Sequence, residues 1–183
     1  MTALNVPTKQ QHPHTMKEER LVPMAIVPSV DHRSHSSLRV LVVEDYEPFR
    51  RFVCSTLGKR PELQIIGEVS DGSEAVHKAE ELKPNLILLD VGLPTLSGID
   101  AARRIRDVSP ESRILFVSQE TSNDVVEEAL RIGALGYVAK ALAGIELLAA
   151  IDAVCQGRKF VGSGYTGLDL TAVHPSRPLT ILP

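Results

Sequence analysis

The sequence has few aromatic residues and few cysteines, and its basic residues do not outnumber its acidic ones. It contains no Trp, four Phe, three Tyr and two cysteines, Cys54 and Cys155. Two cysteines are too few for a disulfide scaffold, so we expect free thiols in a reducing cytoplasm. The 20 Lys and Arg against 23 Asp and Glu give a formal net charge of −3. Because nucleic-acid-binding chains usually carry a basic surplus, we expect no direct DNA binding.

The sequence also lacks a long hydrophobic run. No stretch approaches the roughly 18 consecutive apolar residues that a membrane-spanning helix needs. The longest apolar run in residues 1–37 covers residues 21–27, is interrupted by Pro23, and precedes no small-residue cleavage pattern. We therefore expect no membrane association, no secretory signal and a cytoplasmic location.

Composition divides the chain into a packed body and two tails. Residues 1–37 contain no aromatic residue and no Gly, but four His, four Pro and four Ser. Such a segment buries too little apolar surface to offset its ordering entropy, so we predict disorder. A metal-binding tract of histidines is the alternative. All aromatic residues lie between Tyr46 and Tyr165. We predict one domain over residues 38–163 and a short disordered tail over residues 164–183.

Within this body, short hydrophobic stretches alternate with segments of helical spacing. The stretches are typical of buried strands, and they cover residues 38–43, 63–69, 86–90, 114–117 and 136–139. Apolar residues at intervals of three or four follow each stretch, which predicts a helix after every strand. Asp71 with Glu74 is typical of a helix N-cap, Thr121 is a second candidate cap, and Gly133 is typical of a helix end.

Five strand–helix cycles predict an α/β fold with a flavodoxin-like, doubly wound, five-stranded parallel sheet and helices on both faces. The first, third and fourth strands are almost wholly apolar, as central strands of a parallel sheet are. The second strand carries Gln64 and Glu68, which indicates an edge. The strand order 2-1-3-4-5 satisfies these constraints.

Polar side chains lie where the predicted strands end. Glu44 and Asp45 follow the first strand, Asp90 ends the third, Ser118 follows the fourth, and Lys140 follows the fifth. Ligands of open α/β sheets bind beside the carboxyl ends of the strands, so we expect these side chains to meet. For each residue taken alone, a cap of the next helix is the favoured interpretation. Their occurrence at four strand ends favours a functional site.

Three carboxylates in one place require a compensating charge. Two like charges about 4 Å apart repel by about 4 kcal/mol at an effective dielectric constant of about 20. Glu44, Asp45 and Asp90 therefore need raised pKa values or a cation between them. Oxygen ligands with an open side suit Mg²⁺, and Lys140 and Ser118 are able to contact phosphoryl oxygens. Since an Asp carboxylate is a nucleophile toward phosphorus, we predict phosphorylation of Asp90.

These motifs resemble the receiver domain of bacterial two-component response regulators. The resemblance rests on RVLVVED at residues 39–45, LILLDVGLPTLSG at 86–98, ILFVS at 114–118 and GALGYVAK at 133–140. It implies that a sensor histidine kinase donates the phosphoryl group that Asp90 accepts. It also implies that Mg²⁺ is bound by Asp45, Asp90 and the backbone carbonyl of Gly92, with Glu44 acting largely through water.

The resemblance implies a switch as well. Ser118 and Tyr137 match the family's switch pair, and Lys140 matches its phosphate-contacting lysine. On phosphorylation Ser118 would turn to a phosphoryl oxygen, and Tyr137 would fill the vacated space, changing the surface of the fourth helix, fifth strand and fifth helix. A partly buried aromatic of an edge strand is the alternative for Tyr137. Gln119 stands where the family most often has a small residue, and Ala141 stands where many members have proline. These two departures bear on the rate of phosphorylation more than on its occurrence.

The GY-x-x-K pattern is most similar to receivers that continue into a helix-turn-helix domain. Only 20 residues follow Ser163, and they include three prolines, too few for such a domain. We therefore expect a stand-alone receiver, not itself an enzyme, that acts on a downstream protein target or a second kinase or regulator. A second copy of the chain is a further candidate partner.

Two other protein classes and one variant of the receiver are alternative interpretations of the sequence. Residues 162–167 match G-x-G-x-x-G, but no helical pattern follows, so a Gly-rich linker is the better interpretation than a dinucleotide site. Aspartyl-phosphate phosphatases typically need a second Asp two residues after the nucleophile, where this chain has Gly92. A receiver that binds its partner without phosphorylation is the third hypothesis, and the full set of site residues disfavours it.

Overall fold

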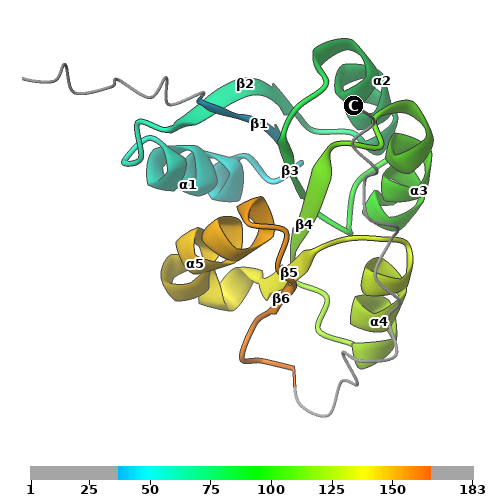
Figure 1. Cartoon of the computed structure of the whole chain (residues 1–183). Coiled ribbons are helices and arrows are strands. Elements are labelled where there is room, and N and C mark those ends of the chain that lie inside the picture. The colour runs from blue at the N-terminus through cyan, green and yellow to red at the C-terminus, as the bar shows by residue number, and fades with distance from the viewer. Residues whose placement is uncertain (1–36, 166–183) are drawn as a thin grey trace, which may run out of the picture. The chain divides into compact units, whose positions relative to one another are not determined.

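Short hydrophobic strands alternate with helices, and the computed structural model, which describes residues 37–165, assembles them into one parallel sheet between two layers of helices (Figure 1). The strands are β1 (Leu38–Val43), β2 (Leu63–Val69), β3 (Leu86–Leu89), β4 (Arg113–Ser118), β5 (Gly136–Ala139) and β6 (Phe160–Val161). The helices are α1 (Glu47–Leu57), α2 (Gly72–Leu82), α3 (Gly98–Val108), α4 (Asn123–Arg131), the 3-10 helix η1 (Lys140–Leu142) and α5 (Ala143–Cys155). The predictions of disordered tails and of a histidine tract concern residues that, apart from 37 and 164–165, lie outside the described range.

The strand order is β2-β1-β3-β4-β5-β6, and every neighbouring pair is parallel. The α/β class, the flavodoxin-like arrangement and the order of the first five strands are confirmed. The predicted number of five strands is wrong, because β6 pairs with β5 and continues the sheet. Two residues are too few to show a periodic pattern, so this strand has no signature in the sequence.

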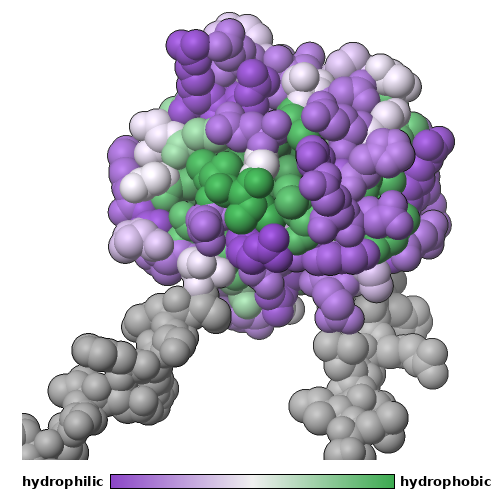
Figure 2. Space-filling model, turned by 90° about the horizontal axis from the view of Figure 1, so that it is seen from above, coloured by the Kyte–Doolittle hydropathy of each residue, from purple (hydrophilic) through white to green (hydrophobic). Residues whose placement is uncertain are grey.

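Hydrophobic residues on both faces of the sheet form two core clusters. Alternate residues of a strand point to opposite faces, so Val40 and Val42 pack with α1 and α5, whereas Leu41 and Val43 pack with α2, α3 and α4. Burial on both faces explains why β1, β3 and β4 are almost continuously apolar. Figure 2 shows the surface from one side, with hydrophilic residues around a hydrophobic patch.

Each helix of residues 37–165 is too short or too polar to cross a bilayer.

The two cysteines lie on α1 and α5 and pack beside the same core cluster. Burial raises the pKa of the Cys54 thiol to about 11, and burial also raises the pKa of Cys155. Because the thiolate is the reactive form, both residues stay protonated and inert near neutral pH. The two residues are free thiols, as expected from the sequence.

Helix ends follow the predicted signals in part. The Asp71 carboxylate accepts hydrogen bonds from the backbone N–H groups of Ser73 and Glu74 at 2.8 and 3.2 Å, which confirms the cap of α2. The cap predicted at Thr121 is wrong, because Ser122 is the N-cap of α4 and makes no side-chain capping bond. The N–H of Ser122 donates instead to the Glu120 side chain at 3.0 Å, so the loop before α4 is held by its own side chains.

Two glycines occupy positions that a larger residue would disturb. Gly133 follows α4 with φ of +98°, and its N–H donates to the Leu130 carbonyl oxygen at 3.1 Å, which confirms the predicted helix end. Gly98 begins α3, and a Cβ added there would lie 1.8 Å from the carbonyl oxygen of Asp90. The backbone of α3 therefore approaches the backbone at the end of β3 as closely as a glycine allows.

Replacing Gly98 with Ala should destabilise the fold, because the added methyl group overlaps the backbone of Asp90. We expect a loss of about 1–3 kcal/mol in the free energy of unfolding, as is typical of overpacking, measured by urea denaturation. Gly144→Ala is the matched control, since a Cβ there has no neighbour within 4 Å and Ala is the better helix former. Wild-type stability of Gly98→Ala would contradict this close approach.

Candidate functional site

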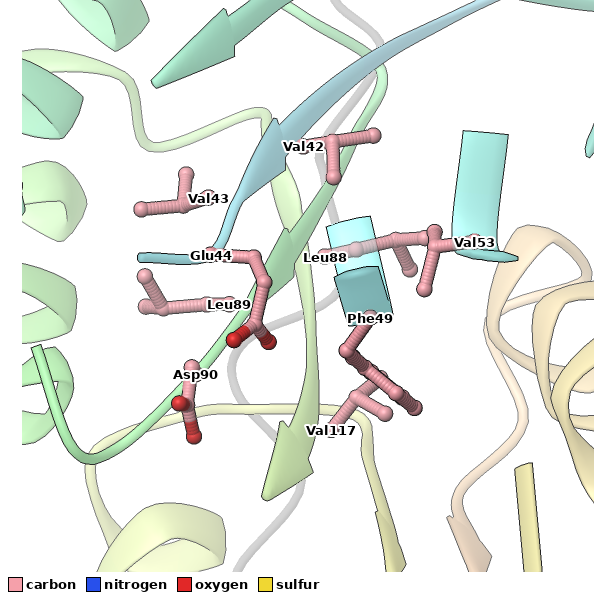
Figure 3. Close-up of a pocket in the computed structure, with 9 residues that line it drawn as sticks. All are labelled: Val42, Val43, Glu44, Phe49, Val53, Leu88, Leu89, Asp90 and Val117. Atoms are coloured by element: carbon pink, nitrogen blue, oxygen red, sulfur yellow. The ribbon is translucent and has the colours of Figure 1, made fainter. Parts of the chain in front are cut away.

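The sheet brings the polar strand ends to one edge. Glu44 follows β1, Asp90 follows β3, Ser118 ends β4, and Lys140 follows β5. Figure 3 shows the Glu44 and Asp90 side chains near one another at neighbouring strand ends, in a small pocket otherwise lined by hydrophobic side chains including Phe49. The structure thus brings together residues that are far apart in the sequence.

Lys140 links two carboxylates inside this site. Its Nζ lies 2.7 Å from Glu44 Oε1 and 2.7 Å from Asp90 Oδ2. The side chains of Lys140, Glu44 and Asp90 are 8%, 4% and 6% exposed. Nζ also lies 5.0 Å from the centroid of the Phe49 ring, within the range of a cation–π interaction. One buried ammonium therefore faces two buried carboxylates.

Burial and hydrogen bonding have opposite effects on the pKa of Glu44 and on the pKa of Lys140. Burial is the largest effect on Glu44 and raises the pKa of its carboxyl group, although the hydrogen bond from Lys140 opposes the change. Burial alone would lower the pKa of Lys140, but the hydrogen bonds to Asp90 and Glu44 raise it above its ordinary value. The ammonium therefore stays protonated at neutral pH and remains a charged hydrogen-bond donor.

Asp45 adds a third carboxylate on the solvent side. Glu44, Asp45 and Asp90 each offer an oxygen atom, and these atoms lie within 4.8 Å of one another. Asp45 is exposed whereas the other two residues are buried, so the cluster opens to solvent at Asp45. Oxygen ligands with an open side suit Mg²⁺, and this cluster includes neither a thiolate nor an imidazole. The donor set therefore fits Mg²⁺.

Backbone contacts orient the Asp90 carboxylate. Its Oδ1 accepts a hydrogen bond from the Val91 N–H at 2.7 Å. Gly92 lies beside the other oxygen, since a Cβ added to Gly92 would be 3.9 Å from Asp90 Oδ2. The two departures from the family pattern, Gln119 and Ala141, are both exposed.

Ser118 and Tyr137 meet beneath the loop that follows β4. Ser118 is 2% exposed and Tyr137 is fully buried. The Ser118 Oγ accepts a hydrogen bond from the Glu120 N–H at 3.2 Å, and the Tyr137 hydroxyl donates to the Glu120 carbonyl oxygen at 2.9 Å. Burial raises the pKa of Tyr137, while a hydrogen bond with Ser118 opposes the change. The tyrosine therefore stays a neutral donor held by this loop.

The alternative interpretation of Tyr137 as a partly buried residue of an edge strand is wrong. Its strand β5 is covered by β6, and its ring stacks on Phe116 with the two centroids 5.9 Å apart. The ring of Tyr165 packs edge-on against it at a centroid distance of 5.3 Å. Tyr137 thus packs against two aromatic rings in the core.

Three residues near the site were not recognised from the sequence. The sequence marks Phe49 only as an apolar residue at helical spacing, whereas in the structure its ring covers Lys140. Glu120 contributes through its backbone, which carries no sequence signature. Tyr165 lies in the segment interpreted as a linker. A contact between residues distant in sequence gives no periodic signal, so no pattern in one sequence would have identified these three.

Comparison with known proteins identifies the family. Residues 40–152 match the sequence model of the response regulator receiver domain. The chain therefore belongs to the receiver domains of two-component response regulators, and the resemblance noted in its motifs is confirmed.

Named relatives are transcriptional regulators. The DNA-binding transcriptional activator DevR/DosR of Mycobacterium tuberculosis is 35% identical over 124 residues, which cover 68% of this chain and 57% of the relative. The transcriptional regulatory protein LiaR of Bacillus subtilis is 32% identical over 139 residues, covering 76% and 66%. The aligned part is thus less than two thirds of the length of either relative.

Solved structures share the fold. A two-component response regulator of the LuxR family from Aurantimonas sp. SI85-9A1 superposes with a TM-score of 0.65 at 31% identity, covering 68% of this chain and 89% of that one. The response regulator domain of Thermotoga maritima CheB superposes with a TM-score of 0.61 at 32% identity, covering 65% and 96%. The second match shows that this chain contains nearly all of an isolated receiver domain.

Removing the charge of Lys140 should destabilise the protein, because the buried carboxylates of Glu44 and Asp90 would then lack the positive charge that compensates them. For Lys140→Met we expect a loss of about 3 kcal/mol in the free energy of unfolding at pH 7, as for other buried pairs that lose one member, measured by urea denaturation in metal-free buffer. Lys59→Met, at an exposed position, is the control and should be close to neutral. A Lys140→Met protein as stable as the control would show that the ammonium is not needed there.

Proposed function

We propose that this protein is a phosphoacceptor of a two-component phosphorelay, in which a sensor histidine kinase phosphorylates Asp90. The observation that carries the proposal is the buried contact of Lys140 with Asp90 and Glu44 in a chain that belongs to the receiver family. Asp90 lies at a strand end with one carboxylate oxygen held by backbone and the other by an ammonium. This arrangement suits a nucleophile that must approach phosphorus in one orientation.

In the proposed reaction a carboxylate oxygen of Asp90 forms a bond to phosphorus as the bond from phosphorus to the kinase histidine breaks. Mg²⁺, held by Asp45, Asp90 and the Gly92 carbonyl with Glu44 acting through water, would neutralise charge on the phosphoryl oxygens. Lys140 contacts Asp90 before the transfer and then contacts a phosphoryl oxygen. The chain assists its own modification without turning over a substrate, so we class it as a signalling protein and not an enzyme.

Two further hypotheses are less well supported. An aspartyl-phosphate phosphatase would need a second Asp two residues after Asp90, where this chain has Gly92. An unphosphorylated pseudo-receiver would have no use for three carboxylates whose oxygens lie within 4.8 Å of one another, two of them bonded to an ammonium. The complete cluster therefore favours the phosphoacceptor.

The output surface in our proposal comprises α4, β5 and α5. Ser118 would leave the Glu120 N–H for a phosphoryl oxygen, and Tyr137, which already lies beneath the same loop, would occupy the vacated space. The partner is a downstream protein, a second kinase or regulator, or a second copy of the chain. We further propose that this chain acts in the cytoplasm by protein contacts without binding DNA itself, whereas one relative is a DNA-binding activator.

Phosphorylation is tested directly by intact mass. With Mg²⁺ and a small phosphodonor such as acetyl phosphate, we expect the wild-type chain to gain about 80 Da, the mass of one phosphoryl group, and Asp90→Asn to gain nothing. Asp107→Asn, at an exposed position on α3, is the matched control and should be modified like the wild type.

Two results would decide against the phosphoacceptor. A mass gain that persists in Asp90→Asn would place the phosphoryl group elsewhere. No gain in the wild type, together with partner binding that is unchanged in Asp90→Asn, would identify a pseudo-receiver.

A further inference from the structure

The chain returns to the sheet after α5 and covers the edge of β5 (Figure 1, orange). We call residues 160–165 the strap. The strap begins with β6, which pairs in parallel with β5, and the Gly162 N–H donates to the Tyr137 carbonyl oxygen at 2.9 Å. It therefore lies on part of the α4–β5–α5 surface that we propose as the output of the receiver.

The side chain of Tyr165 closes the strap over Tyr137. Tyr165 is 9% exposed, and its ring meets the Tyr137 ring edge-on at 5.3 Å between centroids. Both hydroxyls donate to the carbonyl oxygen of Glu120, from Tyr137 at 2.9 Å and from Tyr165 at 3.4 Å. Turning the Tyr137 ring out of the core would break its contact with Tyr165 and its bond to Glu120 together.

A carboxylate on α5 holds the middle of the strap. Oε1 of Glu146 accepts hydrogen bonds from the Ser163 N–H at 2.9 Å and from the Ser163 Oγ at 2.5 Å. Gly162 makes this approach feasible, since a Cβ there would lie 2.4 Å from Glu146 Oε2. The first glycine of the G-x-G-x-x-G motif thus serves packing against α5. The contacts with β5, Glu120 and α5 fix the strap at three places.

We propose that the strap locks Tyr137 in its buried position. Docking of the strap, which includes Tyr165, is thereby coupled to the phosphorylation state of Asp90. The inference rests on the proposed function. Phosphorylation draws Ser118 away and favours the buried ring of Tyr137, and the ring of Tyr165 packs against the Tyr137 ring in that buried position. Because both events favour the same arrangement, docking of the strap and occupancy of the phosphoryl site must strengthen each other by the same factor.

The coupling is tested on the full chain with beryllofluoride and Mg²⁺, a mimic of the phosphoryl group. In wild-type protein we expect the mimic to slow amide hydrogen exchange in residues 160–165. Tyr165→Ala should exchange faster there and should bind beryllofluoride about fivefold or more weakly, in the usual range of coupling between sites. Ile145→Ala, which removes a side chain that is 84% exposed on α5, is the control and should alter neither quantity.

A second variant guards against a folding defect in Tyr165→Ala. Glu146→Ala removes the anchor on α5 without removing a core ring, and we expect it to change exchange and affinity in the same direction.

Failure of the strap and failure of the proposed function give different results. If wild-type protein binds beryllofluoride and Asp90→Asn does not, but exchange in the strap is unchanged or faster and both variants bind with wild-type affinity, the coupling is wrong and the phosphoacceptor stands. If wild-type protein does not bind the mimic, or Asp90→Asn binds it equally well, the proposed function is overturned and the coupling with it.

Discussion

The interaction on which this structure depends is a buried ammonium between two buried carboxylates. Parallel strands β1 and β3 end at the same edge of the sheet, so Glu44 and Asp90 are brought together despite their like charge. Burying such charges costs several kcal/mol for each ion unless they are paired. Lys140 provides that partner, 2.7 Å from each carboxylate. One ammonium does not neutralise three acidic groups, and the remaining charge faces solvent at Asp45, where a divalent cation or a phosphoryl group would enter.

The charged cluster and the proposed output surface are connected through short stretches of chain. Ser118 ends β4 two residues before Glu120, whose backbone contacts both Ser118 and Tyr137. Tyr137 precedes Lys140 by three residues on and after β5. In the proposed switch, a displacement of Ser118 toward Asp90 would therefore reach an aromatic ring of β5 over a few contacts. Packed side chains with two discrete arrangements are the usual carriers of such coupling.

The predictable parts of this molecule are those specified by local chemistry. Continuous burial makes β1, β3 and β4 apolar along their length, and the Asp71 cap and the Gly133 helix end depend on their own neighbours, so one sequence indicates all of them. The strap is different, because β6 has two residues and Tyr165 packs against Tyr137, which is distant in sequence. Phe49 shows helical periodicity but no sign of its contact with Lys140. The rule that ligands bind beside the carboxyl ends of parallel strands predicts which acidic residues come together. The residues that surround them depend on tertiary packing.

The most direct test of the account is the effect of Mg²⁺ on unfolding at neutral pH. The charge left uncompensated by Lys140 predicts that Mg²⁺ stabilises wild-type protein, by about 2.7 kcal/mol at a concentration one hundred times the dissociation constant. Asp45→Asn should be at least as stable as the wild type in metal-free buffer, because one repulsive charge is gone, and should gain far less from Mg²⁺. A wild-type unfolding midpoint that is insensitive to Mg²⁺, or an equal gain in Asp45→Asn, would contradict the account.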